Sequence, residues 1–448
     1  MKRLFVSVLL GLSLTILAGQ VSAQTAVMKQ FTPFPGGGQG LYWVPSSGPI
    51  SHIAFLVDHR TANVLGPNVV TQELPKRGFS VLGVNTRFIN NEASVNWELI
   101  ALDVRAGVRF LRSQPGITKV ILIGSSGGGP TSSYYQAVAT NGTAYCKSSP
   151  LQQKLSECSD SQLSGFLPTD RADGIAFLDA HPGNTVNVLR SLNAAVKKEG
   201  NPNSPLNEKL NPFNTANGFN PDGDSVYSKK FVDKYTDEQS NRMNDLIDLA
   251  LQMRADIAAG VSLPTGDDAF IAYRESARLS DFSTGVWKGT LNPAKLLKND
   301  GTIDASKVVN TVRVPDPSNK QTDESFGGTL FRTLTSFLSA NAIRSFNSLE
   351  GIDWCSSNNS TPCAVASLSP SLPILVMSMQ GHYFIRDGEF IYQSSVSTDK
   401  DYVVVEGATH GLTPCTPCSA LHGNADYSKA TLNLFNYVRD WANKPGRF

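Results

Sequence analysis

The sequence predicts an α/β fold with a mostly parallel central sheet and helices on both of its faces. From about residue 50 onward, short β-branched runs alternate with segments whose apolar residues recur at helical spacing. Such alternation is typical of parallel strands that are joined by helices, which then cover both sides of the sheet. A glycine-rich turn, KVILIGSSGGGP at residues 119–130, joins one of these strands to the next helix.

The predicted elements follow one another in a regular order. The first predicted strand is ISHIAFLV, and a closing helix follows the last strand. The predicted strands cover residues 50–57, 79–84, 119–123, 174–178, 373–377 and 402–405. The predicted helices cover residues 68–77, 95–113, 130–140, 186–198, 237–259 and 427–442.

The strand signal disappears between the fourth and the fifth of these strands. Residues 199–223 are rich in Asn, Pro and Gly and predict a long surface loop, and the helix at 237–259 follows. We expect the span 199–345 to be a large insertion that lies as a lid or cap over one edge of the sheet. The core then consists of residues 24–198 and 346–448.

The first 23 residues have the features of a secretory signal peptide. Lys2 and Arg3 precede an apolar run from Leu4 to Ala18, and small residues precede a cut after Ala23. A membrane anchor is the alternative, but an apolar run of about 15 residues is short for a bilayer span. The rest of the sequence has no second run of sufficient length. We therefore expect a periplasmic or secreted protein with no membrane span after signal removal.

The chain contains six cysteines, an even number that indicates disulfides in an exported protein. Pairing of sequence neighbours predicts the disulfides 146–158, 355–363 and 415–418, although other connectivities are possible. The last pair could instead be a redox site, but it lacks the setting of a strand followed by a helix. A structural zinc site would need a second Cys/His pair. No metal or cofactor is expected, and the formal net charge of +1 indicates no nucleic-acid partner.

The turn at residues 124–128 reads GSSGG and fits the pattern G-x-S-x-G. Because such a turn is sharp, the residues two before and two after the nucleophile must be small. Ser126 meets this condition, whereas Ser125 would place the branched side chain of Ile123 at one of these positions. A phosphate-binding loop would end in Gly-Lys-Ser/Thr, which is absent here. We therefore predict that Ser126 is a catalytic nucleophile.

With this turn, the chain resembles the α/β-hydrolase family over roughly residues 39–198 and 345–448. In that family the nucleophile, the acid and the base occur in the order Ser, Asp or Glu, His, and the histidine follows the last strand. Among the six histidines, His410 in VEGATHG stands at that place, so the resemblance implies that it takes the proton of Ser126. Weaker candidates for the base are His59, His181 and His422.

The resemblance places the acid in the turn before the last strand, at residues 378–389. The usual position falls near His382, which cannot serve as the acid. Asp387 is the nearest carboxylate and is our prediction, although it could simply cap the helix that follows. Glu389 is a second candidate. Asp179, at the end of the strand after the serine turn, is a third, since some lipases of the family take the acid from there.

The reaction also needs backbone N–H donors that stabilise an oxyanion. The resemblance implies one donor at Gly127 and a second in the loop after the first predicted strand, where Thr61 has the expected position. The family often has His-Gly in this loop, and here Arg60 replaces the glycine. Its side chain is predicted to bind a substrate carboxylate, or else to pair with Asp58.

These residues predict an exported serine hydrolase that cleaves a carboxylic ester, in a small molecule or a polymer, through an acyl-enzyme. The motif is equally compatible with cleavage of a C–C bond in a β-diketone or with an amidase. Dehalogenase chemistry on this fold is disfavoured, because it uses an Asp nucleophile. A non-catalytic binding protein is also disfavoured, because both the nucleophile and the base are present. The substrate and the oligomeric state stay open.

Overall fold

The computed structural model describes residues 25–147, 155–156, 158–261, 266–318 and 328–448. The predicted signal peptide and its cut after Ala23 lie outside these residues. Among the helices in the described ranges, none is long and apolar enough to cross a membrane.

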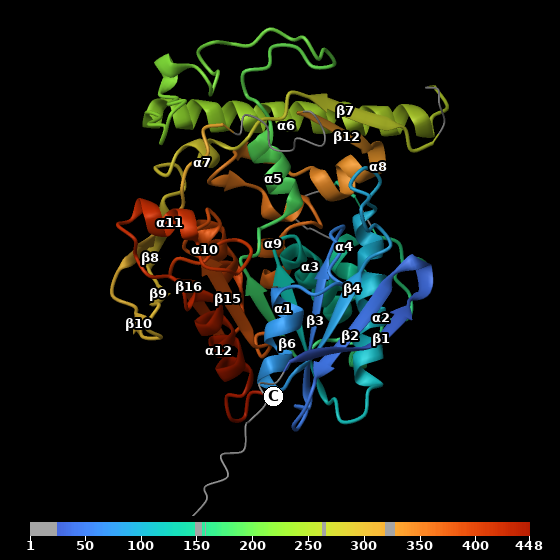
Figure 1. The fold of residues 1–448 in the computed structure, drawn as a ribbon. Coiled ribbons are helices and arrows are strands. Elements are labelled where there is room, and N and C mark those ends of the chain that lie inside the picture. The colour runs from blue at the N-terminus through green and yellow to red at the C-terminus, as the bar shows by residue number, and fades with distance from the viewer. Residues whose placement is uncertain (1–24, 148–154, 157, 262–265, 319–327) are drawn as a thin grey trace, which may run out of the picture.

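A ten-stranded sheet with the order β1-β2-β4-β3-β5-β6-β15-β16-β9-β10 forms the centre of the molecule (Figure 1). The strands from β4 to β9 in this order are parallel, whereas β1, β2 and β10 are antiparallel to their neighbours. Together with helices on both faces and a serine turn after β5, this sheet is the α/β-hydrolase fold, as the resemblance implied. The strands of the sheet are β1 Ala26–Pro33, β2 Gln39–Pro45, β3 Ile53–His59, β4 Ser80–Asn85, β5 Lys119–Ser125, β6 Gly174–Leu178, β9 Lys295–Leu297, β10 Ile303–Asp304, β15 Ile374–Met379 and β16 Lys400–Val405.

Helices cover both faces of the sheet because the inner strands are apolar on both sides. Within β3, Leu56 packs in a core cluster with α2 and α3, whereas Phe55 packs in another with α1 and α12. Both side chains are fully buried, and each such burial stabilises the fold by about 1.5–3 kcal/mol. The α-helices are α1 Val69–Glu73, α2 Ile100–Arg112, α3 Gly128–Asn141, α4 Ala144–Lys147, α5 Asn184–Ser191, α6 Lys229–Ala258, α7 Leu279–Phe282, α8 Leu334–Ser336, α9 Thr361–Ala366, α10 Ile385–Ser394, α11 Thr416–Leu421 and α12 Ala430–Ala442.

Much of the chain between β6 and β15 lies beyond the carboxyl ends of the sheet strands, above the sheet in Figure 1. A separate apolar core holds α5 and α6 against two short strands through Val186, Leu246, Phe270 and Leu330. The short strands of this region pair as β7 Ala269–Tyr273 with β12 Thr329–Thr333, β8 Gly289–Pro293 with β11 Val308–Asn310, and β13 Ser345–Asn347 with β14 Gly351–Ile352.

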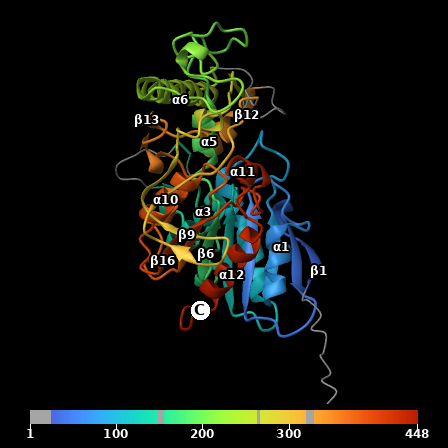
Figure 2. The same ribbon diagram turned by 60° about the vertical axis from the view of Figure 1, so that its left-hand side comes forward.

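Part of the span 199–345 does not lie beyond the strand ends but joins the main sheet. Its strands β9 and β10 extend the main sheet beside β16, so this part of the insertion runs down the edge of the core (Figure 2).

The three predicted disulfides are confirmed: Cys146–Cys158, Cys355–Cys363 and Cys415–Cys418.

Two further differences have local causes. The strand β1 was not predicted because it lies at the sheet edge and is mostly exposed, so it has no buried apolar run. The helix α6 begins at Lys229, not at residue 237, because the side chain of Ser228 accepts the Phe231 N–H and caps the helix.

Candidate functional site

The turn between β5 and α3 presents Ser126 at its tip. Ser126 has a φ of 52°, in the left-handed region that is costly for a residue with a side chain. Ser125, by contrast, is the last residue of β5 and pairs with Leu178. A methyl group on Gly124 would lie 2.8 Å from the Gly129 Cα atom, and one on Gly128 would overlap the Asp58 carbonyl oxygen. The expected need for small residues around Ser126 is therefore a steric property of this turn.

His410 lies in the loop after β16 and reaches Ser126. Its Nε2 atom is 3.0 Å from the Ser126 Oγ atom, which is hydrogen-bond distance. The side chain is 37% exposed, so the imidazole is open to solvent on one side. The structure thus brings together the two residues that were predicted as nucleophile and base.

The carboxylate beside His410 belongs to Asp179, which directly follows β6. Its Oδ2 atom lies 2.6 Å from His410 Nδ1, and its Oδ1 atom accepts the Met379 N–H at 3.0 Å. Burial raises the pKa of this carboxyl group, but His382 and His410 more than offset burial, so the pKa lies below its ordinary value. Asp179 is therefore ionised at neutral pH although its side chain is fully buried.

The predicted acid, Asp387, lies elsewhere, and the prediction needs correction. Asp387 is in the first turn of α10, where both of its carboxylate oxygens accept from Arg190 Nη1 at 2.9 and 3.0 Å. Burial raises the pKa of Asp387, and Arg190 partly offsets this effect. Glu389 is also engaged, because it accepts the backbone N–H groups of Leu291 and Asn292. The carboxylate that is hydrogen-bonded to His410 is therefore that of Asp179, and not that of Asp387 or Glu389.

His382 occupies the position where the resemblance had placed the acid. Its ring stacks on His410 with centroids 4.4 Å apart, and its Nδ1 atom lies 2.7 Å from Asp179 Oδ2. The His382 Nδ1 atom does not meet hydrogen-bond geometry toward this oxygen. Burial lowers the pKa of His382 to about 4, and Asp179 only partly offsets this effect. His382 is therefore neutral near pH 7 and packs against the base.

Asp179, His382 and His410 could also offer ligand atoms to a metal ion, since these atoms lie within 4.8 Å of one another. Both histidine Nδ1 atoms already lie against the same oxygen of Asp179, and His410 Nε2 points at Ser126. A metal ion bound by all three residues would have to displace the contact between Asp179 and His410. The hydrogen-bonded arrangement fits a proton relay better than a metal centre.

The loop after β3 differs from the expected oxyanion arrangement. The Thr61 N–H, which was predicted as the second donor, donates instead to His59 Nδ1 at 3.1 Å, and the Ala62 N–H donates to the same atom at 2.8 Å. Thr61 thus already has an internal acceptor. Gly127, the other predicted donor, follows Ser126 at the start of α3, and no acceptor for its N–H is recorded among the described residues.

Arg60 pairs with Glu92 and not with Asp58, the protein partner that was expected. Its Nε and Nη2 atoms donate to the two carboxylate oxygens of Glu92 at 3.2 and 2.9 Å. Asp58 instead accepts from Ser132 Oγ at 2.9 Å. The guanidinium group therefore already has a carboxylate partner within the protein, Glu92.

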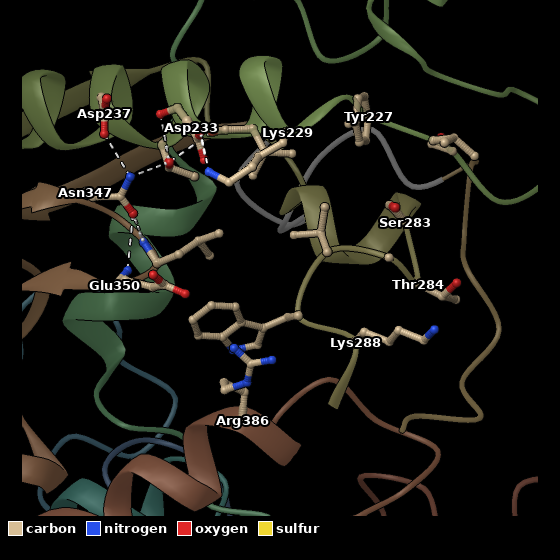
Figure 3. Close-up of a pocket in the computed structure, with 18 of the residues that line it drawn as sticks. Tyr227, Lys229, Asp233, Asp237, Ser283, Thr284, Lys288, Asn347, Glu350 and Arg386 are labelled. Atoms are coloured by element: carbon tan, nitrogen blue, oxygen red, sulfur yellow. Dashed lines mark hydrogen bonds and ion pairs between the residues drawn. The ribbon is translucent and has the colours of Figure 1, made fainter. Parts of the chain in front are cut away.

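Two cavities differ in their relation to this site. A cavity of about 230 Å³ is lined by His59, Ser126 and His410 together with parts of α1. A cavity of about 940 Å³ lies in the insertion, where Lys229 and Asp233 on α6 lie above Arg386 of α10 (Figure 3). The second cavity contains none of the residues around His410, so its larger volume does not mark the reactive site.

Comparisons with known proteins add only distant similarities. No protein-family model and no curated protein match the sequence. The chain is similar to the α/β hydrolase GrgF from Penicillium sp. sh18 with 12% identity and a TM-score of 0.39, covering 95% of this chain and 99% of that chain. It is similar to DcsB, in complex with its substrate analogue, with 11% identity and a TM-score of 0.40, covering 93% and 97%. Esterase Est22 has 16% identity and a TM-score of 0.25 over 35% and 44% of the two chains. Since these scores are low, the proposals below rest on this chain's own side chains.

The serine turn should not tolerate a methyl group at residue 128. We expect Gly128→Ala to lower the free energy of unfolding by about 2 kcal/mol or more, because the Asp58 carbonyl oxygen occupies the space of the new carbon. Gly66→Ala is the matched control, because a methyl group there meets nothing within 4 Å, and its effect should stay within about 0.5 kcal/mol. Urea unfolding of the two variants measures both values. Equal effects would contradict the close packing of this turn.

Acid pH should destabilise the fold through His382. The pKa of His382 is about 4 in the folded protein and 6.5 in its ordinary state, so between these values the unfolded chain binds a proton that the folded chain does not. As the pH drops from 6.5 to 4, the contribution of His382 should therefore lower the free energy of unfolding by about 1.4 kcal/mol per pH unit. Urea unfolding of His382→Gln should show a shallower pH dependence than the wild type over this window, and equal slopes would contradict the assignment.

The buried pair of Arg190 and Asp387 should support stability. Asp387→Asn would leave Arg190 as a buried cation without a counter-charge, which costs about 3–5 kcal/mol in comparable cases. We expect a correspondingly lower free energy of unfolding in urea. Replacing both residues together, as Arg190→Met with Asp387→Leu, should recover much of the loss. An Asp387→Asn variant as stable as the wild type would contradict the importance of this pair.

Proposed function

We propose that the protein is a serine hydrolase that cleaves a carboxylic ester, with Ser126 as nucleophile, His410 as base and Asp179 as acid. The observation that supports this proposal is the continuous contact from Ser126 Oγ through both ring nitrogens of His410 to Asp179 Oδ2, at 3.0 and 2.6 Å. Serine is a weak nucleophile unless a base takes its proton, and the base must be held in one tautomer. His410 can meet the first condition through its contact with Ser126, and Asp179 can meet the second through its contact with His410.

The reaction would proceed in two stages. His410 Nε2 takes the proton of Ser126 as Oγ attacks the ester carbonyl, and the Gly127 N–H donates to the oxyanion. The tetrahedral intermediate expels the alcohol, which receives the proton from His410, and leaves an acyl group on Ser126. Water then attacks the acyl carbon with His410 again as the base, and the carboxylic acid is released. Asp179 stays ionised throughout and stabilises the imidazolium.

We further propose that the insertion is a fixed cap over this site. Arg278, from the insertion, lies 4.6 Å above the ring of Tyr383, whose centroid is 4.1 Å from that of His382. His382 in turn stacks on His410. This continuous line of contacts supports a role of the insertion in shaping the substrate site, since it connects the insertion with His410.

We also propose that the protein acts in the periplasm or outside the cell. Three disulfides support this location, because such bonds form and persist in oxidising compartments.

Replacing the nucleophile should abolish activity without loss of the fold. We expect Ser126→Ala to lose roughly 10⁴-fold or more in kcat with p-nitrophenyl esters, and to lose labelling by a fluorophosphonate probe. Ser125→Ala is the matched control and should keep both, because Ser125 is the last residue of β5 and the hydroxyl at hydrogen-bond distance from His410 is that of Ser126. A labelled Ser126→Ala variant would contradict the proposed nucleophile.

Replacing the acid should separate the two candidate carboxylates. We expect Asp179→Asn to lose roughly 10⁴-fold in kcat at neutral pH, because the amide cannot stabilise the imidazolium. Asp387→Asn, assayed well below its melting temperature, should keep most of the kcat of the wild type. The reverse pattern would restore Asp387 as the acid and remove Asp179 from the mechanism.

A further inference from the structure

The imidazole of His59 is held in one tautomer by its own loop. His59 is the last residue of β3, and its Nδ1 atom accepts two backbone N–H groups, from Thr61 and Ala62. A ring nitrogen that accepts hydrogen bonds carries no proton, so the proton of the neutral ring must be on Nε2. His59 therefore presents an N–H donor from Nε2.

This donor is also uncharged over the range in which such an enzyme would work. Burial and the nearby Arg60 lower the pKa of His59 to about 3, and Glu92 only partly offsets them. A neutral imidazole donates a hydrogen bond without competing for the proton that passes between Ser126 and His410.

The donor atom lies beside the residue that follows the nucleophile. A methyl group on Gly127 would lie 2.5 Å from His59 Nε2, so this atom is at most about 5 Å from the Gly127 N–H nitrogen. Two donors can reach one oxygen when they are separated by up to about 5.8 Å, twice the usual hydrogen-bond length. His59 also shares a cavity of about 230 Å³ with Ser126 and His410. An oxygen bound by Gly127 is thus within reach of His59.

We propose that the side chain of His59 is the second donor of the oxyanion hole, in the place that backbone position alone assigns to Thr61. This inference rests on the proposed function, since it presumes attack by Ser126. As the bond between Oγ and the carbonyl carbon forms, the π electron pair moves to the carbonyl oxygen. That oxygen then accepts hydrogen bonds from Gly127 N–H and His59 Nε2–H, and no proton is transferred from either donor. His59 therefore acts as a catalytic residue that stabilises charge.

A pair of amide variants separates this role from mere support of the loop. In His59→Asn, the amide oxygen can replace Nδ1 as acceptor for Thr61 and Ala62, but the side chain is too short to reach the oxyanion. In His59→Gln, the amide nitrogen can replace Nε2, but no acceptor remains at the position of Nδ1. We expect His59→Asn to lose about 10²-fold in kcat with p-nitrophenyl acetate, with a KM and a melting temperature close to those of the wild type. His59→Gln should retain more kcat than His59→Asn but melt at a lower temperature.

The rate of labelling of Ser126 by the fluorophosphonate probe provides a second readout, because phosphonylation also places a P=O oxygen in the oxyanion hole. We expect His59→Asn to be labelled more slowly than the wild type. Normal labelling and turnover in His59→Asn, with losses confined to His59→Gln, would show that His59 only supports the loop and would overturn this inference alone. Absence of Ser126 labelling in the wild type would overturn the proposed function and this inference together.

Discussion

The contact between Asp179 and His410 is the interaction on which the site depends. It joins the ends of β6 and β16, and the Met379 N–H adds the end of β15, so three neighbouring strands converge on one carboxylate. A buried carboxylate is costly unless hydrogen-bond donors and opposite charge compensate for the lost water. The register of these parallel strands therefore determines whether His410 can be held against Ser126.

The proposed role of Asp179 has a consequence for the turn after β15. With the proposed acid at Asp179, this turn does not need to carry a carboxylate. It places His382 and Tyr383 there instead, and these rings connect His410 with Arg278 of the insertion. The inserted span begins after β6 and ends before β15, so it stands in the chain between Asp179 and the turn that it contacts. The turn after β15 thus contacts both His410 and the inserted span.

The parts of the molecule that depend on local sequence were predictable. The inner strands, the glycine turn around Ser126 and the neighbouring disulfide pairs follow from residue type and spacing within short segments. The carboxylate beside His410 did not follow, because Asp179 comes directly after β6 and Asp387 lies in the first turn of the helix after β15, and only the direction of each side chain decides between them. Asp387 points at Arg190, a residue 197 positions earlier in the chain. Thr61 was predicted as an oxyanion donor from its backbone position alone. In the structure, its N–H group donates to the side chain of His59.

The most direct test of the central contact is proton NMR of the histidine ring N–H groups. A short hydrogen bond from His410 Nδ1–H to a buried carboxylate shifts this proton strongly downfield. If Asp179 is the acid, the resonance should be present in the wild type and in Asp387→Asn, and absent in Asp179→Asn. A resonance that persists in Asp179→Asn, or that disappears in Asp387→Asn while the protein stays folded, would contradict the role of Asp179.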